Sequence, residues 1–259
     1  CAISIGSKFE NDYVGKFGDY SIFSFGFYKF INVLSGGMVF SKNKYFYNYL
    51  IEKEKNWKEI KIYNLYKLII KSFFIRLLGS KIIFNLIFPI IKFANKYDVK
   101  LITKLLINDP KPHRKDSFPE EYKFRLSQLQ INDIIFQFNN LEYQRKSRVQ
   151  NYKTYSENIK NKKIIFFHNK QNLLNENACL NFPIIVKNKN QFINYMLDNE
   201  IDINPQFYRS VNELSFLSKY SHETRLIQDS VSNLVTLPTY PGINENYILK
   251  IIEIINRYE

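Results

Sequence analysis

Gly18-Asp19-Tyr20-Ser21-Ile22-Phe23-Ser24-Phe25-Gly26-Phe27-Tyr28-Lys29 is the stretch that decides the fold, and Ser35-Gly36-Gly37-Met38-Val39 follows it closely. The alternation in Ile22-Phe23-Ser24-Phe25 predicts a strand whose serine faces away from its aromatic neighbours. Lys29 is then expected at the end of a buried apolar strand, where an amine loses its proton more readily than in water. We therefore expect Ser24 and Lys29 to hold one ligand that carries an aldehyde and a phosphate.

These residues resemble the DegT/DnrJ/StrS family of sugar aminotransferases. The family pattern is a Gly-Asp, then Phe-Ser-Phe, the cofactor lysine, and a Gly-Gly before a strand. Two later segments also resemble the family: Tyr122 to Gln130 looks like its segment that opens a long helix, and Leu234 to Pro241 looks like its closing Leu-Pro-x-Tyr-Pro segment. Three matches in the right order are much more specific than one.

The resemblance implies an α/β protein, namely the C-terminal part of a fold-type-I transferase that depends on pyridoxal 5'-phosphate (PLP). Such enzymes are homodimers that move an amino group from an amino acid, typically glutamate, to a nucleotide-linked keto-sugar. By the resemblance, Lys29 is the catalytic lysine that binds the cofactor and moves the proton. Ser24 would hold the cofactor phosphate. Surface polysaccharide or glycan biosynthesis is the expected pathway.

The chain departs from the family pattern at several positions. The family has an aspartate immediately before the residue matching Cys1, so we expect an N-terminally truncated fragment that is inactive alone and active as the complete protein. Ile3 stands where the family has Gln or His, and Lys123 where it has an Asn that reaches the partner subunit's cofactor phosphate. A lysine can still meet a phosphate as a point charge. The alternative is a catalytically inactive homologue that binds a sugar nucleotide or acts as a membrane-associated partner protein.

The candidate substrate residues lie in one later segment. Gln206 and Phe207 occupy the place where family members carry a His-Tyr or similar pair near the sugar, and Arg209 could meet a diphosphate bidentately.

Three domains are expected from the pattern. Residues 1–43 would end the large PLP-binding domain, residues 44–118 would form a basic apolar helical insertion, and residues 119–259 would form a long helix and a small α+β C-terminal domain. Within the insertion, Gly79-Ser80 should separate two helices and Pro89 should end or kink the second. In the last part we expect a helix over 128–159, strands over 163–167 and 182–186, and helices over 191–199 and 245–258.

The composition limits which classes of partner and which cellular compartment are expected. The net charge of +13 admits nucleic acid, anionic membranes or phosphorylated small molecules, but the dispersed lysines and the lack of a binding signature disfavour nucleic acid. Cys1 and Cys179 make no disulfide framework, and the three scattered histidines, His113, His168 and His222, make no metal site. A cytoplasmic homodimer is expected.

The apolar residues of the insertion leave two alternatives open. Residues 62–93 could lie in the inner membrane interface, or their helices could bury their apolar faces on the protein or its dimer partner. The longest uncharged run, from Ile82 to Ile91, is too short to cross a bilayer.

Overall fold

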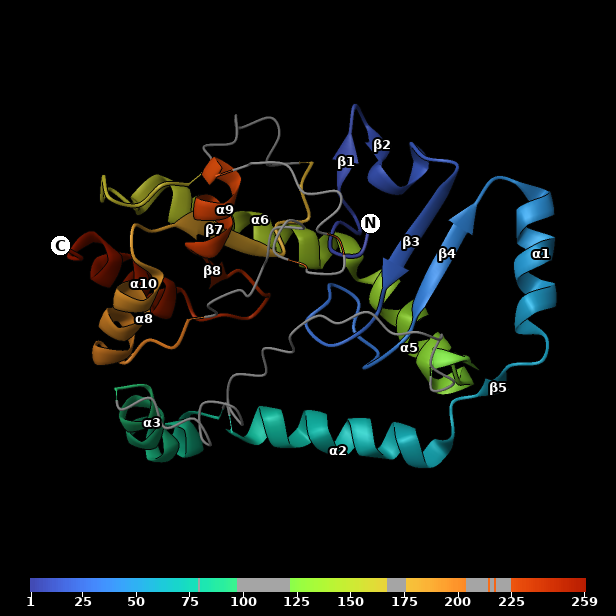
Figure 1. Cartoon of the computed structure of the whole chain (residues 1–259), viewed down its shortest axis with the longest axis horizontal. Helices are drawn as coiled ribbons and strands as arrows, with labels where there is room; N and C mark the ends of the chain where they lie inside the picture. Colours follow the sequence, from blue (N-terminus) through green and yellow to red (C-terminus); the bar gives the residue numbers. More distant parts are fainter. Residues whose placement is uncertain (79, 97–121, 167–175, 204–213, 215–216, 218–224) are drawn as a thin grey trace. The chain divides into compact units, whose positions relative to one another are not determined.

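The computed structural model describes residues 1–78, 80–96, 122–166, 176–203, 214, 217 and 225–259 (Figure 1). Two units share the chain, and each is assembled from separate stretches. Unit 1 contains Cys1–Leu77, Ser117–Gln150 and Asn169–Leu180, and unit 2 contains Leu78–Asp116, Asn151–His168 and Asn181–Glu259. The three consecutive domains predicted, with boundaries at residues 43 and 118, are a different kind of division from these two units. They stay a prediction.

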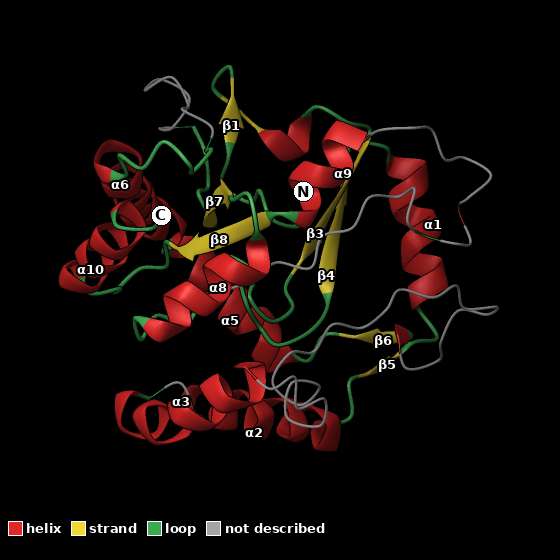
Figure 2. Cartoon of the chain, turned by 60° about the vertical axis from the view of Figure 1, so that its left-hand side comes forward, coloured by secondary structure: helices red, strands yellow, loops and turns green. Residues whose placement is uncertain are grey.

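Unit 1 is a mixture of short strand pairs and helices (Figure 2). In chain order its elements are β1 (Lys8–Phe9), β2 (Asp12–Tyr13), the 3-10 helix η1 (Val14–Lys16), β3 (Tyr20–Ser24), β4 (Gly37–Ser41), α1 (Lys44–Glu54), β5 (Lys58–Glu59), α2 (Ile62–Leu78), β6 (Phe124–Arg125) and α5 (Gln128–Asn139). Helix α6 (Leu141–Asn158) belongs to both units, because the boundary falls after Gln150.

The hairpin of β3 and β4 contains most of the stretch from Gly18 to Lys29 and the Gly36-Gly37 pair. The two strands are antiparallel, with Tyr20 opposite Ser41 at one end and Ser24 opposite Gly37 at the other. Phe25, Phe30, Ile31 and Val33, from the loop that joins the strands, form the core of unit 1 with Ile5 and Ala178. The burial of that loop explains why so many of its residues are apolar.

The expected long helix over 128–159 is two helices. Asn140 ends α5, where its backbone N–H donates to the carbonyls of Gln137 and Phe138 and its side chain donates to the carbonyl of Phe136. Helix α6 begins at the next residue. An asparagine that bonds its own helix end competes with helix continuation, which is the physical reason for the break.

Unit 2 packs helices on one strand pair. Its elements are α3 (Lys81–Lys96), β7 (Asn181–Ile185), α8 (Lys189–Asp198), α9 (Arg225–Ser232), β8 (Leu234–Pro238) and α10 (Glu245–Asn256). Strands β7 and β8 are antiparallel. Their inward residues Phe182, Ile184 and Leu237 are fully buried, as are Phe192 of α8 and Ile251 of α10. This alternation of strands and helices agrees with the predicted α+β arrangement.

Two details of the expected secondary structure differ. The strand expected over 163–167 is an isolated bridge between Ile165 and Ile185 in the described residues, and Phe167 lies outside them. Helix α2 ends at Leu78 and α3 begins at Lys81, which agrees with two separate helices, but α3 continues through Pro89 to Lys96. None of the described helices combines the length and the apolarity that a membrane span needs.

Candidate functional site

Lys29 lies in the loop between β3 and β4 rather than at a strand end. Strand β3 ends at Ser24, and the chain then turns so that the backbone N–H of Lys29 donates to the carbonyl of Gly26 at 3.3 Å. The Lys29 side chain is half-buried. Its neighbour Tyr28 has a φ of 62°, a left-handed conformation that non-glycine residues rarely adopt. Such backbone outliers are concentrated at functional sites, because the surrounding structure must hold them in place.

Ser24 is the last residue of β3 and faces away from the core of unit 1. Its neighbour Phe25 is 1% exposed and Phe23 packs against the core, whereas Ile22, on the same face as Ser24, is 65% exposed. The predicted alternation is therefore correct. The Ser24 hydroxyl lies 3.9 Å from the point that a side-chain carbon on Gly26 would occupy, so it is directed over the first turn of the lysine loop.

The two glycines at the end of the loop are required by close approaches. Gly36 has a φ of +88°, and a Cβ there would lie 2.4 Å from Cδ2 of Leu126. A Cβ on Gly37 would lie 2.4 Å from the backbone oxygen of Phe23. The Gly-Gly pair thus lets Leu126 and strand β3 come close to the loop that carries Lys29.

Helix α5 holds this loop through two glutamine side chains. The amide of Gln130 donates to the carbonyl of Val33 at 3.0 Å and to the hydroxyl of Ser35 at 3.2 Å. Gln137, two turns later on the same helix face, donates to the carbonyl of Asn32 and accepts from its N–H, both at 3.0 Å. These four bonds fix residues 32–35, and we call this set the glutamine clamp.

Gln130 also completes the start of α5. Its side-chain oxygen accepts from the backbone N–H of Ser127, while the Ser127 hydroxyl accepts from the N–H of Gln130. This reciprocal arrangement is a capping box, which satisfies two otherwise unpaired backbone donors. Only 4% of Gln130 is exposed, so its amide makes all these bonds away from water. The glutamine clamp was not predicted, although the Ser-x-x-Gln pattern and the seven-residue spacing were visible in the sequence.

A buried arginine packs behind the lysine loop. The guanidinium of Arg148, on α6, lies 4.8 Å from the ring centre of Phe30, the residue after Lys29, and donates to the carbonyl of Leu180 at 3.2 Å. Its burial lowers the pKa of Arg148 to about 10. The guanidinium thus supports the loop from the core side by a cation–π contact.

The other predicted site residues fall into two groups. Lys123 is half-buried and lies one residue before β6, three residues from Leu126, which touches Gly36. Ile3 is 50% exposed. The candidate substrate residues, Gln206, Phe207 and Arg209, lie outside the described residues, as do His113, His168 and His222.

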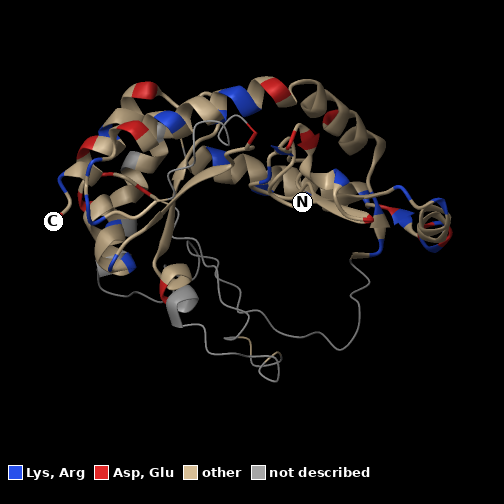
Figure 3. Cartoon of the chain, turned by 90° about the horizontal axis from the view of Figure 1, so that it is seen from above, with Lys and Arg blue, Asp and Glu red and all other residues tan. Residues whose placement is uncertain are grey.

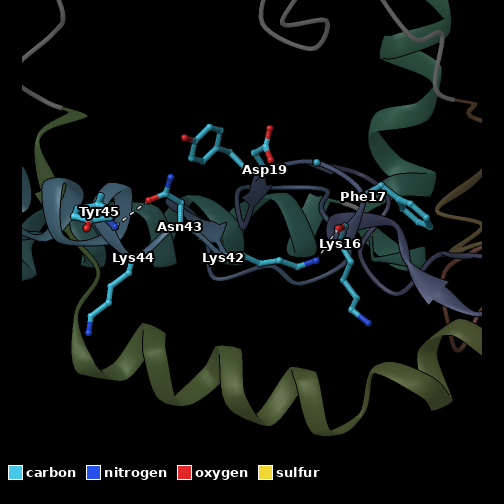
Figure 4. Close-up of a pocket in the computed structure, with 9 residues that line it drawn as sticks. Lys16, Phe17, Asp19, Lys42, Asn43, Lys44 and Tyr45 are labelled. Carbon is cyan, nitrogen blue, oxygen red and sulfur yellow. Dashed lines mark hydrogen bonds between the residues drawn. The ribbon is translucent and has the colours of Figure 1, made fainter.

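A surface pocket occurs at the opposite end of the hairpin from Ser24. Its volume is about 520 Å³, and Figure 4 shows Lys16, Asp19, Lys42 and Lys44 among its lining residues. At about 3.4 Å per residue, the four steps from Tyr20 to Ser24 along β3 place this pocket roughly 14 Å from Ser24. The pocket is therefore separate from the lysine loop.

Comparison with known proteins bears on the family of the chain. The model of the DegT/DnrJ/EryC1/StrS aminotransferase family matches residues 1–53 and 109–256. No curated protein matches the chain. The unmatched residues between these two ranges fall within the predicted insertion.

Solved structures of sugar aminotransferases have the same fold. A DegT DnrJ EryC1 StrS aminotransferase from Brucella abortus is 17% identical with a TM-score of 0.65, and the match covers 98% of this chain and 54% of that one. PseC of Helicobacter pylori, an aminotransferase involved in the biosynthesis of pseudoaminic acid, is 14% identical with a TM-score of 0.66, and the match covers 98% and 57%.

A third match is the PLP form of Spr1654 from Streptococcus pneumoniae, which is 15% identical with a TM-score of 0.59. That match covers 98% of this chain and 55% of the other. The chain thus spans little more than half the length of these solved structures. With its family motifs in order around a clamped lysine loop, the chain belongs to the DegT/DnrJ/EryC1/StrS aminotransferase family.

Proposed function

We propose that the protein is a PLP-dependent aminotransferase that moves an amino group from an amino acid, glutamate, to a nucleotide-linked keto-sugar. We place this reaction in the biosynthesis of surface polysaccharides or glycans, and we propose that the enzyme works as a cytoplasmic homodimer. Family membership supports the reaction class. The relative involved in pseudoaminic acid biosynthesis supports a sugar substrate.

The observation that carries the proposal is the position of Lys29. Its half-buried amine follows a left-handed residue in a loop that four hydrogen bonds hold to α5. A surface lysine that only interacts with water needs no such support. A catalytic amine, in contrast, must be held within a fraction of an ångström of its working position. A lysine amine is also the group that holds an aldehyde cofactor.

The residues present fit the cofactor in chemical type. Lys29 supplies an amine for the aldehyde, and Ser24 supplies a hydroxyl, turned toward the same loop, for the phosphate. Lys123 could add a positive charge for the phosphate of a partner subunit. Bound PLP supplies an electron sink that lets the amino group leave one carbon and join another. Lys29 Nζ then accepts and returns the proton at that carbon.

Three residues are proposed to contact the substrate. We propose that Gln206 and Phe207 contact the sugar and that Arg209 binds the diphosphate of the nucleotide. The net charge of +13 supports an anionic substrate, because a positive surface attracts it over a distance. In Figure 3 the basic residues are spread over many elements rather than gathered in one arm.

A cofactor-trapping experiment tests the proposal. The complete gene product, incubated with PLP and reduced with borohydride, should carry the cofactor on the peptide that contains Lys29. Lys29→Ala should abolish both the label and the visible absorbance of bound PLP. Lys42→Ala is the matched control, since Lys42 lies in the same hairpin but at its other end, and it should retain both.

Two results would overturn the proposal. Absence of PLP absorbance in the complete protein would indicate the catalytically inactive homologue, and a label that persists in Lys29→Ala would assign the cofactor to another lysine. The amino donor is tested separately by adding glutamate or alanine to the PLP-loaded protein and recording the loss of that absorbance.

A further inference from the structure

Helix α2 exposes an unusual amount of apolar surface. Leu65 is its only buried residue among those described, and Leu68 and Ser72 beside it are half-buried. Ten large apolar side chains on the rest of the helix are between 37% and 66% exposed. Eight of the ten, all except Ile75 and Leu78, lie on one side of the helix. They are Ile62, Tyr63, Tyr66, Ile69, Ile70, Phe73, Phe74 and Leu77, and we call them the apolar arc.

The apolar arc is continuous around the helix. At 3.6 residues per turn its eight members fall within about 140° of the circumference, on the side away from Leu65 and Leu68. Figure 1 shows α2 as one straight segment, so the arc extends along its whole length. An apolar face of this size needs a partner that excludes water.

Basic residues border the apolar arc on both sides. By the same geometry, Lys67 lies about 20° beyond one edge and Arg76 about 20° beyond the other. The ammonium of Lys67 lies 4.4 Å from the ring centre of Tyr63. Long basic side chains at the edges of an apolar face are typical of helices that lie in a membrane interface, where the stems cover lipid and the charges reach the headgroups.

The charge of the surrounding segment indicates what kind of partner covers the apolar arc. Between Glu59 and Asp98 the sequence has no Asp or Glu and seven basic residues, namely Lys61, Lys67, Lys71, Arg76, Lys81, Lys92 and Lys96. A symmetric dimer through this face would bring the same positive patch together from both copies, with no carboxylate in the segment to pair with it. Anionic lipid headgroups are complementary to it instead.

We propose that α2 docks on the surface of an anionic lipid bilayer, with the apolar arc in the interface and the helix parallel to the membrane plane. At 1.5 Å per residue its 17 residues are about 25 Å long, which is less than the roughly 30 Å hydrocarbon core, so the helix lies on the bilayer and does not cross it. The aromatic residues Tyr63 and Tyr66 suit a position in the membrane interface, because tyrosine is enriched there.

The docked helix also touches the lysine loop. The ammonium of Lys71, on the edge of α2 away from the apolar arc, lies 5.7 Å from the ring centre of Phe27, two residues before Lys29. The membrane side of α2 and the loop side of α2 are therefore different faces of one helix. Membrane docking leaves the contact with the lysine loop in place.

Flotation with vesicles tests the proposal. The purified full chain should float with vesicles of phosphatidylcholine and phosphatidylglycerol at low salt, and much less with phosphatidylcholine alone. Because each basic residue near an anionic surface contributes about 1 kcal/mol, Lys67→Gln combined with Arg76→Gln should weaken binding about 30-fold. Ile70→Asp, in the middle of the apolar arc, should weaken binding by about tenfold or more.

The matched control is Leu249→Asp on α10. It makes the same charge change at an apolar residue that is 46% exposed, close to the 53% of Ile70, and it should leave flotation unchanged. A chain that stays in the soluble fraction overturns the proposal. So does a chain that ignores vesicles but forms dimers that Ile70→Asp dissociates, because the apolar arc is then a protein interface. Circular dichroism confirms that each variant keeps its fold.

Discussion

Gln130 connects the start of α5 to the lysine loop, and its substitution should destabilise the fold. Gln130→Ala leaves the buried carbonyl of Val33 and the partly buried N–H of Ser127 without their partners, at about 1–3 kcal/mol for the buried group and less for the other. We expect the free energy of unfolding to fall by about 2–4 kcal/mol in urea titrations, together with weaker PLP binding.

The control for this prediction is Gln128→Ala on the same helix. Gln128 is exposed, and its amide bonds only the neighbouring Asn132 side chain among the bonds described. Its substitution should change the free energy of unfolding by less than about 0.5 kcal/mol. Equal effects of the two substitutions would mean that the glutamine clamp does not stabilise the loop.

Gly36 should not tolerate a side chain. Gly36→Ala adds a Cβ 2.4 Å from Leu126 and also places alanine at a φ of +88°. Gly242→Ala is a matched control, because Gly242 has a φ of +81° but no atom within 4 Å of the added Cβ. We expect both variants to lose about 1 kcal/mol through backbone strain, and Gly36→Ala to lose a further 1–3 kcal/mol, roughly, through the clash. Thermal unfolding measures the difference.

Tyr155 is a residue whose polar atom does not stabilise the fold. Its side chain is fully buried in unit 2, its hydroxyl has no hydrogen-bond partner in the described structure, and burial raises the pKa of this phenol above its usual value. Tyr155→Phe removes the unpaired group, so the free energy of unfolding should stay equal or rise by about 1 kcal/mol.

Tyr195→Phe provides the opposite case. The Tyr195 hydroxyl donates to the carbonyl of Ile254 at 3.0 Å, so its removal should lower the free energy of unfolding by about 1 kcal/mol. A loss of stability in Tyr155→Phe comparable to that in Tyr195→Phe would show that the Tyr155 hydroxyl has a partner in solution.

At the scale of elements, the first turn of α6 carries an acid-sensitive ion pair. Arg145 bonds the Glu142 carboxylate, and this hydrogen bond lowers the pKa of Glu142 below its usual 4.5. Because the folded pKa is lowered, the contribution is complete above the unfolded pKa and is lost as the pH falls through the folded value. The pair is partly exposed, so the contribution is at most about 1 kcal/mol.

Glu142→Gln should therefore lower stability at pH 7, and the difference from the parent chain should vanish in acid. Unfolding titrations between pH 7 and pH 3 measure this. Glu157→Gln, which makes the same charge change near the other end of α6, should not lower stability at pH 7, because a negative charge is unfavourable near a helix C-terminus. A Glu142→Gln effect that persists at pH 3 would contradict the ion-pair explanation.

Local patterns predicted most of the elements that surround the site. The alternation around Ser24 predicted strand β3, and Gly79-Ser80 predicted the break between α2 and α3, because each signal acts within a few residues. The break at Asn140 was missed, since its cause is a side-chain bond to the preceding turn rather than a change in apolar periodicity. A strand was predicted over 163–167, but the described residues there form only an isolated bridge at Ile165. A run of apolar residues alone does not determine the length of a strand.

The candidate site was predicted in part for the same reason. Lys29 and Ser24 stand in a contiguous motif, so the sequence alone was sufficient to propose them, and their roles stay a prediction. The glutamine clamp depends on partners far apart in the chain, such as Gln137 and Asn32, and on the burial of Gln130. Polar residues on a helix usually face solvent, and only the packing of α5 on the loop shows that these two do not.

At the scale of the molecule, each of the two units is discontinuous in sequence. Unit 1 joins its N-terminal residues to Ser117–Gln150 and Asn169–Leu180. The N–H of Ala178 donates to the hydroxyl of Ser7, 171 residues away, and the N–H of Lys8 donates to the carbonyl of Glu176. Truncation after α2 would therefore remove Gln130 and Gln137 of the glutamine clamp and Ala178 of the core, as well as the later elements.

The sequence separation of 105 between Asn32 and Gln137 has a consequence for how the chain is made. At about 5–20 residues per second, a ribosome needs roughly 5–20 s after releasing the loop to supply α5. During that time Phe25, Phe30 and Val33 lack the residues that bury them, and they are available to chaperones. Nascent chains stalled before residue 122 should be cut by protease within the loop, whereas chains released beyond residue 180 should be protected there.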